Sequence, residues 1–290
     1  MKWTEIAAPD FDLATTLDSG QVFHWERFSA GYAGAIGDTP VYVEQKEDML
    51  RVGGAAPQVV AKYFALDHPL PEICRAFPAD PAMTAARDFC SGLRIIRQPH
   101  WECLAAFITS SMKQVAHIRQ MSRALRRKYG TAKRIAGVEV HTFPSAQRIA
   151  ALPELSLREC ALGYRAKNLL GTAQRIASGE ANLRAWAQLE DDDLRERLCD
   201  LPGVGPKVAN CVMLFAYERL RAFPIDVWIE RVLKEKYFPR GSKVTAQKLR
   251  DFCDRYFGEH GGYAQQYLFH HARKTASTQG KTAVAVDLSP

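Results

Sequence analysis

The stretch Leu201-Pro-Gly-Val-Gly-Pro-Lys-Val-Ala-Asn210 decides the fold of this chain. Gly203 and Gly205 stand between a leucine-periodic segment and a second apolar segment. We expect two helices joined by a tight hairpin, because glycine permits a sharp turn and a close approach of the backbone to a partner. A plain helical hairpin, whose glycines serve only the turn, explains the spacing equally well.

The backbone of this hairpin is suited to contact a phosphate. The first N–H groups of a helix lack partners within it, so they can donate to a phosphate oxygen. We expect Gly203, Gly205 and Val208 at such a contact. Contacts of this kind position DNA without reading its sequence. The hairpin therefore indicates nucleic-acid binding but no base preference.

Lys207 is a candidate nucleophile. Pro206 suits the first position of the second helix, which puts Lys207 in its first turn. The helix dipole disfavours an ammonium there by roughly 0.3 to 1 kcal/mol, so a lysine needed only for solubility is better placed elsewhere. An attacking lysine must be neutral, and bringing its pKa from about 10.4 to near 7 costs roughly 4 to 5 kcal/mol.

Desolvation has to supply the rest of the free energy that lowers the lysine pKa, since apolar surroundings disfavour the charged form of lysine. Val204, Val208 and Val212 can provide an apolar wall. Cys211 lies four residues beyond Lys207 on the same helical face, so both side chains can line one pocket. The plainer interpretation of Cys211 is a small core residue.

A second candidate lies in Phe223-Pro-Ile-Asp-Val-Trp228, where Asp226 precedes the apolar residues of a new helix. We expect Asp226 to be the N-cap of that helix. A capping aspartate typically contributes about 1 kcal/mol and needs no other function. A cap can also face a pocket, so a catalytic role stays open.

The charge of the chain favours a polyanionic partner if the excess is gathered on one face. Thirty-nine Lys and Arg against 32 Asp and Glu give a net charge of +7 over 290 residues. Between Lys113 and Arg134 there are eight basic residues and no acidic ones. Such a run can contact several phosphates, although a solvated helix face is the alternative.

The predicted fold class is α+β and mostly helical. From Gln21-Val-Phe-His-Trp25 to Val52, short β-rich runs punctuated by glycine predict an N-terminal antiparallel sheet. Helical periodicity follows after Val60. We expect a sheet-bearing domain over 1–98, a helical domain over 99–274 and a mobile tail over 275–290.

Seven cysteines without a CxxC pair suggest neither a disulfide framework nor a zinc site, so we expect no metal and no cofactor. The N-terminus lacks the apolar run of a signal peptide, and no stretch approaches the roughly 18 apolar residues of a membrane span. We expect an intracellular protein that does not contact membranes.

The chain resembles the helix-hairpin-helix base-excision glycosylase superfamily, and within it the 8-oxoguanine DNA glycosylase/AP lyase family. Lys207 and Asp226, nineteen residues apart, match the superfamily's hairpin and Gly/Pro-Asp signature. The narrower resemblance rests on ordered matches along the chain: Leu17-Asp-Ser-Gly-Gln-Val-Phe-His-Trp, Tyr63-Phe-Ala-Leu-Asp, Gly92-Leu-Arg-Ile-Ile-Arg-Gln, Glu102-Cys-Leu, Phe107-Ile-Thr-Ser-Ser, Leu162-Gly-Tyr-Arg-Ala-Lys and Tyr263-Ala-Gln-Gln-Tyr-Leu-Phe.

The resemblance implies a bifunctional enzyme of base excision repair. Lys207 attacks C1′ of the damaged nucleotide, while Asp226 stabilises positive charge on the sugar. The base leaves, a Schiff base forms, and β-elimination cuts the strand. The lesion must first be flipped out of the duplex into a pocket.

The resemblance also assigns the pocket. Gly20 matches a glycine whose carbonyl accepts the N7 proton that 8-oxoguanine has and guanine lacks. Gln265 matches the residue that binds the Watson–Crick edge, and Phe269 and Cys211 match the stacking walls. Without the surrounding matches these residues read as a turn glycine, a surface glutamine and core residues.

Departures from the family pattern concentrate at the DNA wedge. Met112-Lys113-Gln114 replaces three asparagines, and His117 replaces an arginine that contacts the orphaned cytosine, while Arg165 retains a second one. Gln114, His117 and Arg165 are still expected at the DNA. Trp228 stands where a histidine that contacts phosphate is common. Strict preference for cytosine opposite the lesion is therefore in doubt.

The implied partner is double-stranded DNA containing 8-oxoguanine or an abasic site, bound by a monomer. The implied location is with the DNA, in the cytoplasm or nucleoid of a bacterium or in the nucleus of a eukaryote. Two alternatives stay open. One is a non-catalytic helix-hairpin-helix binder of distorted DNA, and the other is a glycosylase for a different damaged base.

Overall fold

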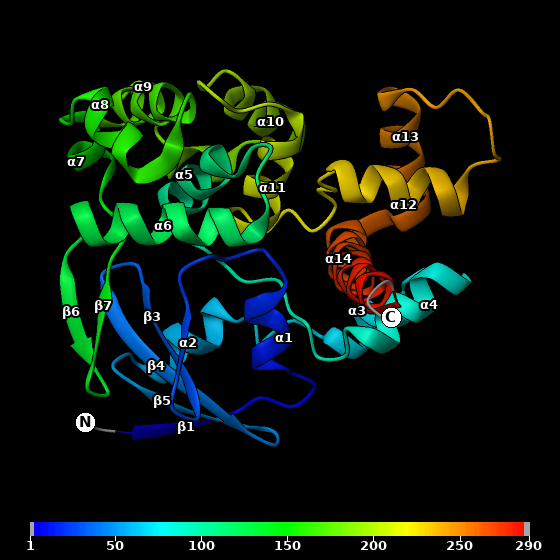
Figure 1. Cartoon of the computed structure of the whole chain (residues 1–290), viewed down its shortest axis with the longest axis horizontal. Helices are drawn as coiled ribbons and strands as arrows, with labels where there is room; N and C mark the ends of the chain where they lie inside the picture. The colour runs from blue at the N-terminus through cyan, green and yellow to red at the C-terminus, as the bar shows by residue number, and fades with distance from the viewer. Residues whose placement is uncertain (1–2, 287–290) are drawn as a thin grey trace.

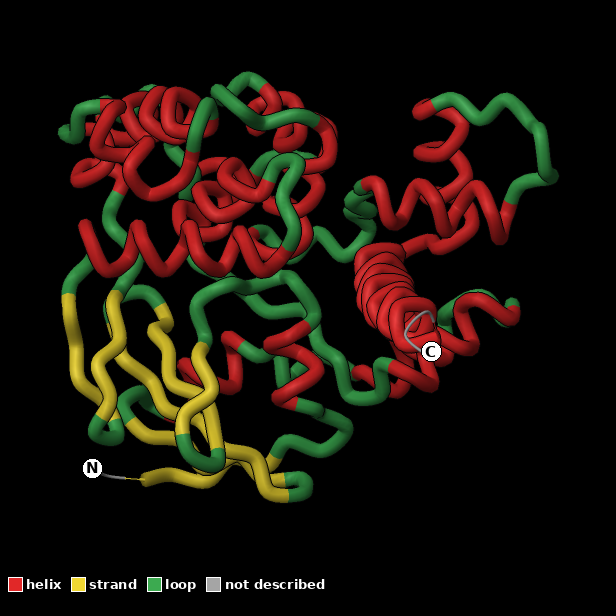
Figure 2. The backbone as a smooth tube through the Cα atoms, in the orientation of Figure 1, coloured by secondary structure: helices red, strands yellow, loops and turns green. Residues whose placement is uncertain are grey.

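The computed structural model describes residues 3–286, with the strands gathered at one end and helices elsewhere (Figure 1, Figure 2). A five-stranded antiparallel sheet forms near the N-terminus in the order β1-β5-β4-β3-β2. Its strands are β1 (Trp3–Ala7), β2 (Glu26–Phe28), β3 (Gly31–Ile36), β4 (Thr39–Lys46) and β5 (Met49–Gly53). The predicted α+β class, mostly helical with an N-terminal antiparallel sheet, is confirmed.

Both faces of the sheet are covered, because successive side chains on a strand point to opposite sides. Val41 and Val43 of β4 join the core under α1 (Leu13–Asp18) and α2 (Pro57–Tyr63). Tyr42, between them, packs with Ile135 in a smaller cluster on the other face. Ile135 ends β6 (Ala132–Ile135), which pairs with β7 (Val138–His141) in a second sheet of two strands.

The segment Gln21–Trp25, predicted as a strand, is instead an irregular connection. Side chains satisfy its backbone in place of a neighbouring strand. Gln98 Nε2 donates to the Gln21 carbonyl at 2.7 Å, and the Gln21 side chain accepts from the Ile96 N–H at 2.7 Å. The periodicity of the sequence cannot reveal these buried hydrogen bonds, because their partners are about 75 residues away.

A helical layer lies above the sheet, and α6 is the helix of this layer that lies next to the strands (Figure 1). Helix α6 is amphipathic: Ile118, Met121 and Leu125 are buried, while Arg123 and Arg127 are exposed. The regular helices of this layer are α5 (His100–Ser110), α6 (Val115–Tyr129), α7 (Ala146–Ala150), α8 (Glu154–Leu157), α9 (Arg165–Ala177), α10 (Asp191–Cys199) and α11 (Pro206–Ala216).

A third group of helices lies beside the other two (Figure 1). It comprises α3 (Leu70–Arg75), α4 (Pro81–Phe89), α12 (Val227–Tyr237), α13 (Ala246–Phe257) and α14 (Gly261–Val286). Phe77, between α3 and α4, meets Tyr267 of α14 edge to face at 5.3 Å between ring centroids. The predicted boundary between residues 98 and 99 therefore separates segments that share one core, since distant parts of the chain pack together here.

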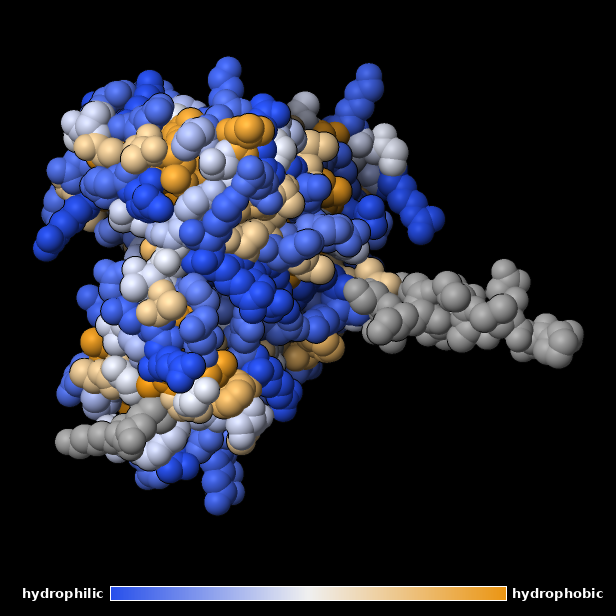
Figure 3. Space-filling model, turned by 60° about the vertical axis from the view of Figure 1, so that its left-hand side comes forward, coloured by the Kyte–Doolittle hydropathy of each residue, from blue (hydrophilic) through white to orange (hydrophobic). Residues whose placement is uncertain are grey.

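The C-terminal helix α14 continues through residues 275–286, where the sequence predicts a mobile tail, and residues 287–290 lie outside the described part. Among residues 3–286, no helix combines the length and apolarity that crossing a bilayer requires. On the face shown in Figure 3, hydrophobic residues lie in small patches among hydrophilic ones. Scattered patches of this kind are ordinary for a folded surface.

Candidate active site

Lys207 lies in the first turn of α11, as predicted. Gly205 is the N-cap residue of this helix and Pro206 its first residue. The Lys207 side chain is half-buried, and its Nζ lies 5.2 Å from the centroid of the Phe107 ring. A ring face attracts a nearby ammonium, so Phe107 helps to fix the position of this side chain.

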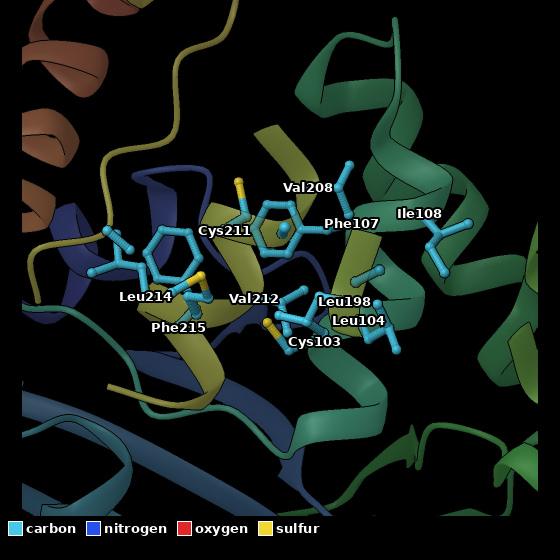
Figure 4. Packing of buried hydrophobic residues seen from close by; sticks show 14 of the residues in the cluster. Cys103, Leu104, Phe107, Ile108, Leu198, Val208, Cys211, Val212, Leu214 and Phe215 are labelled. Atoms are coloured by element: carbon cyan, nitrogen blue, oxygen red, sulfur yellow. The ribbon is translucent and has the colours of Figure 1, made fainter. Parts of the chain in front are cut away.

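Phe107 was missed as a neighbour of the lysine by sequence reasoning. It comes from α5, and it is buried and stacked on Phe215 of α11 at 5.4 Å between ring centroids. Figure 4 shows the apolar side chains of α5 and α11 that fill the interface between these helices. The expected wall of Val204, Val208 and Val212 is buried too. The motif containing Phe107 was visible in the sequence, but its pairing with a residue 100 positions away was not.

Cys211 is buried one turn beyond Lys207. Burial raises the pKa of its thiol to about 11, and the nearby charge of Lys207 only partly offsets this effect. The thiol is therefore protonated at neutral pH. Both side chains lie on one face of α11, as their spacing predicted, and Cys211 is at once a core residue and a neighbour of the lysine.

Asp226 is the N-cap of α12, as predicted: its Oδ1 accepts a hydrogen bond from the Ile229 N–H at 2.8 Å. Burial raises the pKa of this carboxyl, and the Ile229 N–H and the charge of Lys207 oppose the rise. Asp226 and Lys207 therefore interact electrostatically although they belong to different helices. The structure thus brings together the two residues selected for chemistry, and the aspartate is a cap and a neighbour of the lysine at once.

The hairpin between α10 and α11 has the geometry that its glycines predicted. Gly203 has φ +79, and an added Cβ would lie 2.7 Å from Cβ of Asn168, so a side chain is excluded there. Gly205 is exposed, and an added Cβ would meet nothing within 4 Å. Thr172 Oγ1 holds the turn by donating to the Pro202 carbonyl at 2.9 Å. The outer side of the hairpin is therefore open to a partner.

The residues expected to read the base also converge. Gly20 lies in the turn after α1 with φ +88, and an added Cβ would lie 3.0 Å from Cε1 of Phe269. Phe269 and Gln265 are one turn apart on α14. Gln265 is buried, and its Oε1 has no hydrogen-bond partner among the described residues. A buried amide oxygen without a partner is costly, so this atom is available to a ligand.

The wedge region departs from expectation at Arg165. This residue is buried, its Nε donates to the Ser111 carbonyl at 2.9 Å, and its guanidinium lies over the Tyr164 ring. It therefore supports the Met112 turn instead of facing outward. Met112 is 93% exposed with φ +52, and the Gln114 and His117 side chains are exposed as well.

The basic run from 113 to 134 is less available to phosphates than its composition indicated. Four of its eight basic side chains pair with carboxylates from other elements, which only the tertiary structure brings close. The pairs are Arg119 with Asp18, Arg123 with Glu26, Arg126 with Glu102 and Lys128 with Glu159. Arg126 is itself buried. A phosphate contact over this whole run is therefore not supported.

Comparisons with known proteins agree with the sequence resemblance. Residues 4–104 match the family model of the 8-oxoguanine DNA glycosylase N-terminal domain. Residues 105–255 match that of the HhH-GPD superfamily of base excision DNA repair proteins. In the part of the chain that the structure describes, no cluster of three His, Cys, Asp or Glu side chains could hold a metal ion.

Individual relatives are similar over nearly the whole chain. A probable N-glycosylase/DNA lyase of Methanothermobacter thermautotrophicus is 30% identical over 93% of this chain and 96% of its own. An N-glycosylase/DNA lyase of Arabidopsis thaliana is 30% identical over 92% of this chain and 80% of its own. The solved 8-oxoguanine glycosylase/lyase of Clostridium acetobutylicum, in complex with duplex DNA containing cytosine opposite 8-oxoguanine, has a TM-score of 0.87 and 31% identity, covering 94% of this chain and 98% of its own.

Proposed function

This chain belongs to the 8-oxoguanine DNA glycosylase family, and we propose that Lys207 is the nucleophile with which it excises 8-oxoguanine from duplex DNA and then cuts the strand. The observation that carries the proposal is the convergence of Lys207, Asp226 and Cys211 beside the helix-hairpin-helix turn. A half-buried lysine beside apolar side chains, with a carboxylate nearby that can accept its proton, fits covalent catalysis better than phosphate binding alone.

The reaction begins with attack by the neutral Lys207 amine on C1′ of the flipped nucleotide. The glycosidic bond breaks, and its electron pair leaves with the base. The Asp226 carboxylate stabilises the positive charge that develops on the sugar. Its capping bond to the Ile229 N–H fixes the orientation of the carboxylate before DNA binds.

Loss of a proton from the nitrogen and opening of the sugar give a Schiff base between Lys207 and C1′. The iminium acidifies the C2′ proton, so β-elimination breaks the bond to the 3′ phosphate. Hydrolysis of the Schiff base then returns the free lysine. One side chain thus serves both the glycosylase and the AP-lyase steps.

Recognition of the base is proposed for Gly20, Gln265, Phe269 and Cys211. The Gly20 carbonyl accepts the N7–H of 8-oxoguanine, and Gln265 binds the Watson–Crick edge with its unpartnered amide oxygen. Phe269 and Cys211 form the walls on either side of the base. Because guanine has no proton at N7, it would place a lone pair against the Gly20 carbonyl and be rejected.

The DNA backbone is proposed to lie on the hairpin, where the N–H groups of Gly203, Gly205 and Val208 face a phosphate. The exposed Met112, Gln114 and His117 lie where the duplex is opened, with Arg165 supporting their turn from inside. The enzyme acts on DNA inside the cell, in the nucleoid of a bacterium or the nucleus of a eukaryote.

Trapping with borohydride tests the mechanism. Reduction during reaction with an 8-oxoguanine duplex should give a covalent adduct with the wild-type protein and none with Lys207→Gln. Lys234→Gln is the matched control, because Lys234 is half-exposed in an ion pair with Glu230 on α12 and should leave trapping unchanged. Binding without an adduct in the wild type would identify a non-catalytic DNA binder. A panel of damaged bases would reveal a different preferred substrate.

A further inference from the structure

The turn that carries Gly20 is held on both sides by side-chain donors. Three carbonyl groups of this turn accept a hydrogen bond from a long side chain: Asp18 from Arg273, Ser19 from Gln266 at 2.8 Å and Gln21 from Gln98 at 2.7 Å. Within residues 3–286 the Gly20 carbonyl accepts no hydrogen bond. The turn therefore leaves the Gly20 carbonyl available between neighbouring carbonyl groups that are hydrogen-bonded.

The positions of these bonds along the backbone restrict the orientation of the Gly20 carbonyl. Each peptide group is planar, so a bond to the Ser19 carbonyl fixes the peptide plane between Ser19 and Gly20, and a bond to the Gln21 carbonyl fixes the peptide plane that follows Gln21. The plane between them contains the Gly20 carbonyl. Glycine has the widest conformational freedom of all residues, and Gly20 has φ +88, so this plane is free to turn unless both neighbours are held.

Gln266 donates to the Ser19 carbonyl from α14, the helix that also carries Gln265 and Phe269. It is buried, 3% exposed, and stands next to Gln265 on α14. Gln265 and Phe269 lie one turn apart on the helix, whereas Gln266 and Arg273 lie two turns apart on a neighbouring face. Helix α14 thus presents one face to the proposed base site and a second face to the Gly20 turn.

We propose that Gln266 is a positioning residue for lesion recognition: its bond to the Ser19 carbonyl sets the direction of the Gly20 carbonyl relative to Gln265 and Phe269. This inference rests on the proposed role of Gly20. A hydrogen bond to N7–H is directional, so rotation of the Gly20 peptide weakens it. Attack by Lys207 on an abasic site, where no base is present, does not depend on that carbonyl.

The test compares two rates on one DNA sequence, single-turnover excision of 8-oxoguanine and β-elimination at a preformed abasic site. Gln266→Met keeps the length of the side chain and removes its donor. The ratio of excision to elimination should fall about tenfold, the effect of roughly one lost hydrogen bond. Tyr217→Phe is the control, because it removes a buried bond of 2.8 Å to the Leu183 carbonyl outside the site and should leave the ratio unchanged. An unchanged ratio in Gln266→Met overturns the inference.

A second variant, Gln266→Glu, gives a readout that a packing role would not produce. An ionised carboxylate cannot donate to the Ser19 carbonyl, whereas a protonated one can, and burial raises the pKa of a carboxyl group. Relative to the wild type at each pH, the ratio should be low at pH 8 and recover toward about pH 5. A folded variant without recovery contradicts the inference. If Gln266→Met does not fold, Gln266→Glu decides alone.

The two proposals fail differently. A wild-type protein that does not excise 8-oxoguanine contradicts the proposed function. An active wild type whose two Gln266 variants keep its ratio contradicts only the positioning role.

Discussion

Gly20 and Phe269 are in contact although 249 residues separate them: a Cβ atom added to Gly20 would lie 3.0 Å from Cε1 of the phenylalanine ring. The turn after α1 and the helix α14 therefore form two sides of the proposed base site. Glycine is required at this position for two reasons. The backbone has a φ of +88, which is unfavourable for other residues, and the Phe269 ring occupies the space that a side chain would need.

Gly20→Ala should impair recognition of the base more than strand cleavage. The added methyl group must displace the Phe269 ring or the Gly20 carbonyl, and both belong to the proposed base site. We expect single-turnover excision of 8-oxoguanine to fall at least about tenfold, and β-elimination at a preformed abasic site to change by less than about threefold. Equal losses in the two assays would contradict the role assigned to Gly20.

Substitutions of Asp226 should separate its two roles. Asparagine is as good an N-cap as aspartate, so Asp226→Asn should retain stability while losing the charge that supports the sugar cation. We expect excision to fall about a hundredfold with no decrease in the free energy of unfolding, because asparagine keeps the cap and removes a buried charge. Asp226→Ala should lose the same activity and also about 1 kcal/mol of stability, measured by urea unfolding. A fully active Asp226→Asn would exclude the catalytic role.

The pH profile of excision should show the titration of Asp226. Burial raises the pKa of this carboxyl, and only the ionised form stabilises positive charge. The rate should therefore fall on the acidic side at a pH above the ordinary range of aspartate, and this limb should be absent from the residual activity of Asp226→Asn. The same raised pKa affects stability, because the folded state disfavours the ionised Asp226 carboxylate. The destabilising effect of this charge is fully present above the folded-state pKa and is lost as the pH falls below the unfolded-state pKa.

Discrimination of the base opposite the lesion should be weak. Arg165 is turned inward to the Ser111 carbonyl, and the exposed His117 lacks the paired donors of a guanidinium. We expect excision rates opposite cytosine, thymine, guanine and adenine to lie within about tenfold of one another, and His117→Arg to increase the preference for cytosine. A wild-type preference above about a hundredfold would show that Arg165 turns outward when DNA binds.

The salt dependence of DNA binding should show that only part of the basic run from 113 to 134 is available to contact phosphates. Arg123 is paired with Glu26, whereas Lys113 is exposed in the Met112 turn. Lys113→Ala should reduce the slope of log affinity against log salt by about one, and Arg123→Ala by clearly less. Affinities measured by fluorescence anisotropy between 50 and 200 mM salt would distinguish them. Equal slopes for the two variants would contradict this assignment.

Local features were predictable because their causes are local. Proline at the first position of α11, the aspartate cap of α12 and the glycine turn between α10 and α11 follow from residues within one or two helical turns. The strand predicted over Gln21–Trp25 was the exception, because this segment is an irregular connection held by hydrogen bonds from Ile96 and Gln98. A propensity argument does not include such distant partners.

The sequence by itself indicated the proposed nucleophile, its helix, the capping aspartate and the family, because these depend on short-range spacing and on ordered motifs along the chain. Only the tertiary structure decided that Phe107 meets Lys207, that Arg165 faces inward, that half of the basic run is paired, and that Gln266 holds the turn of Gly20. These relationships join residues 24 to 247 positions apart. They arise when helices pack and buried polar groups must find partners, which no local pattern specifies.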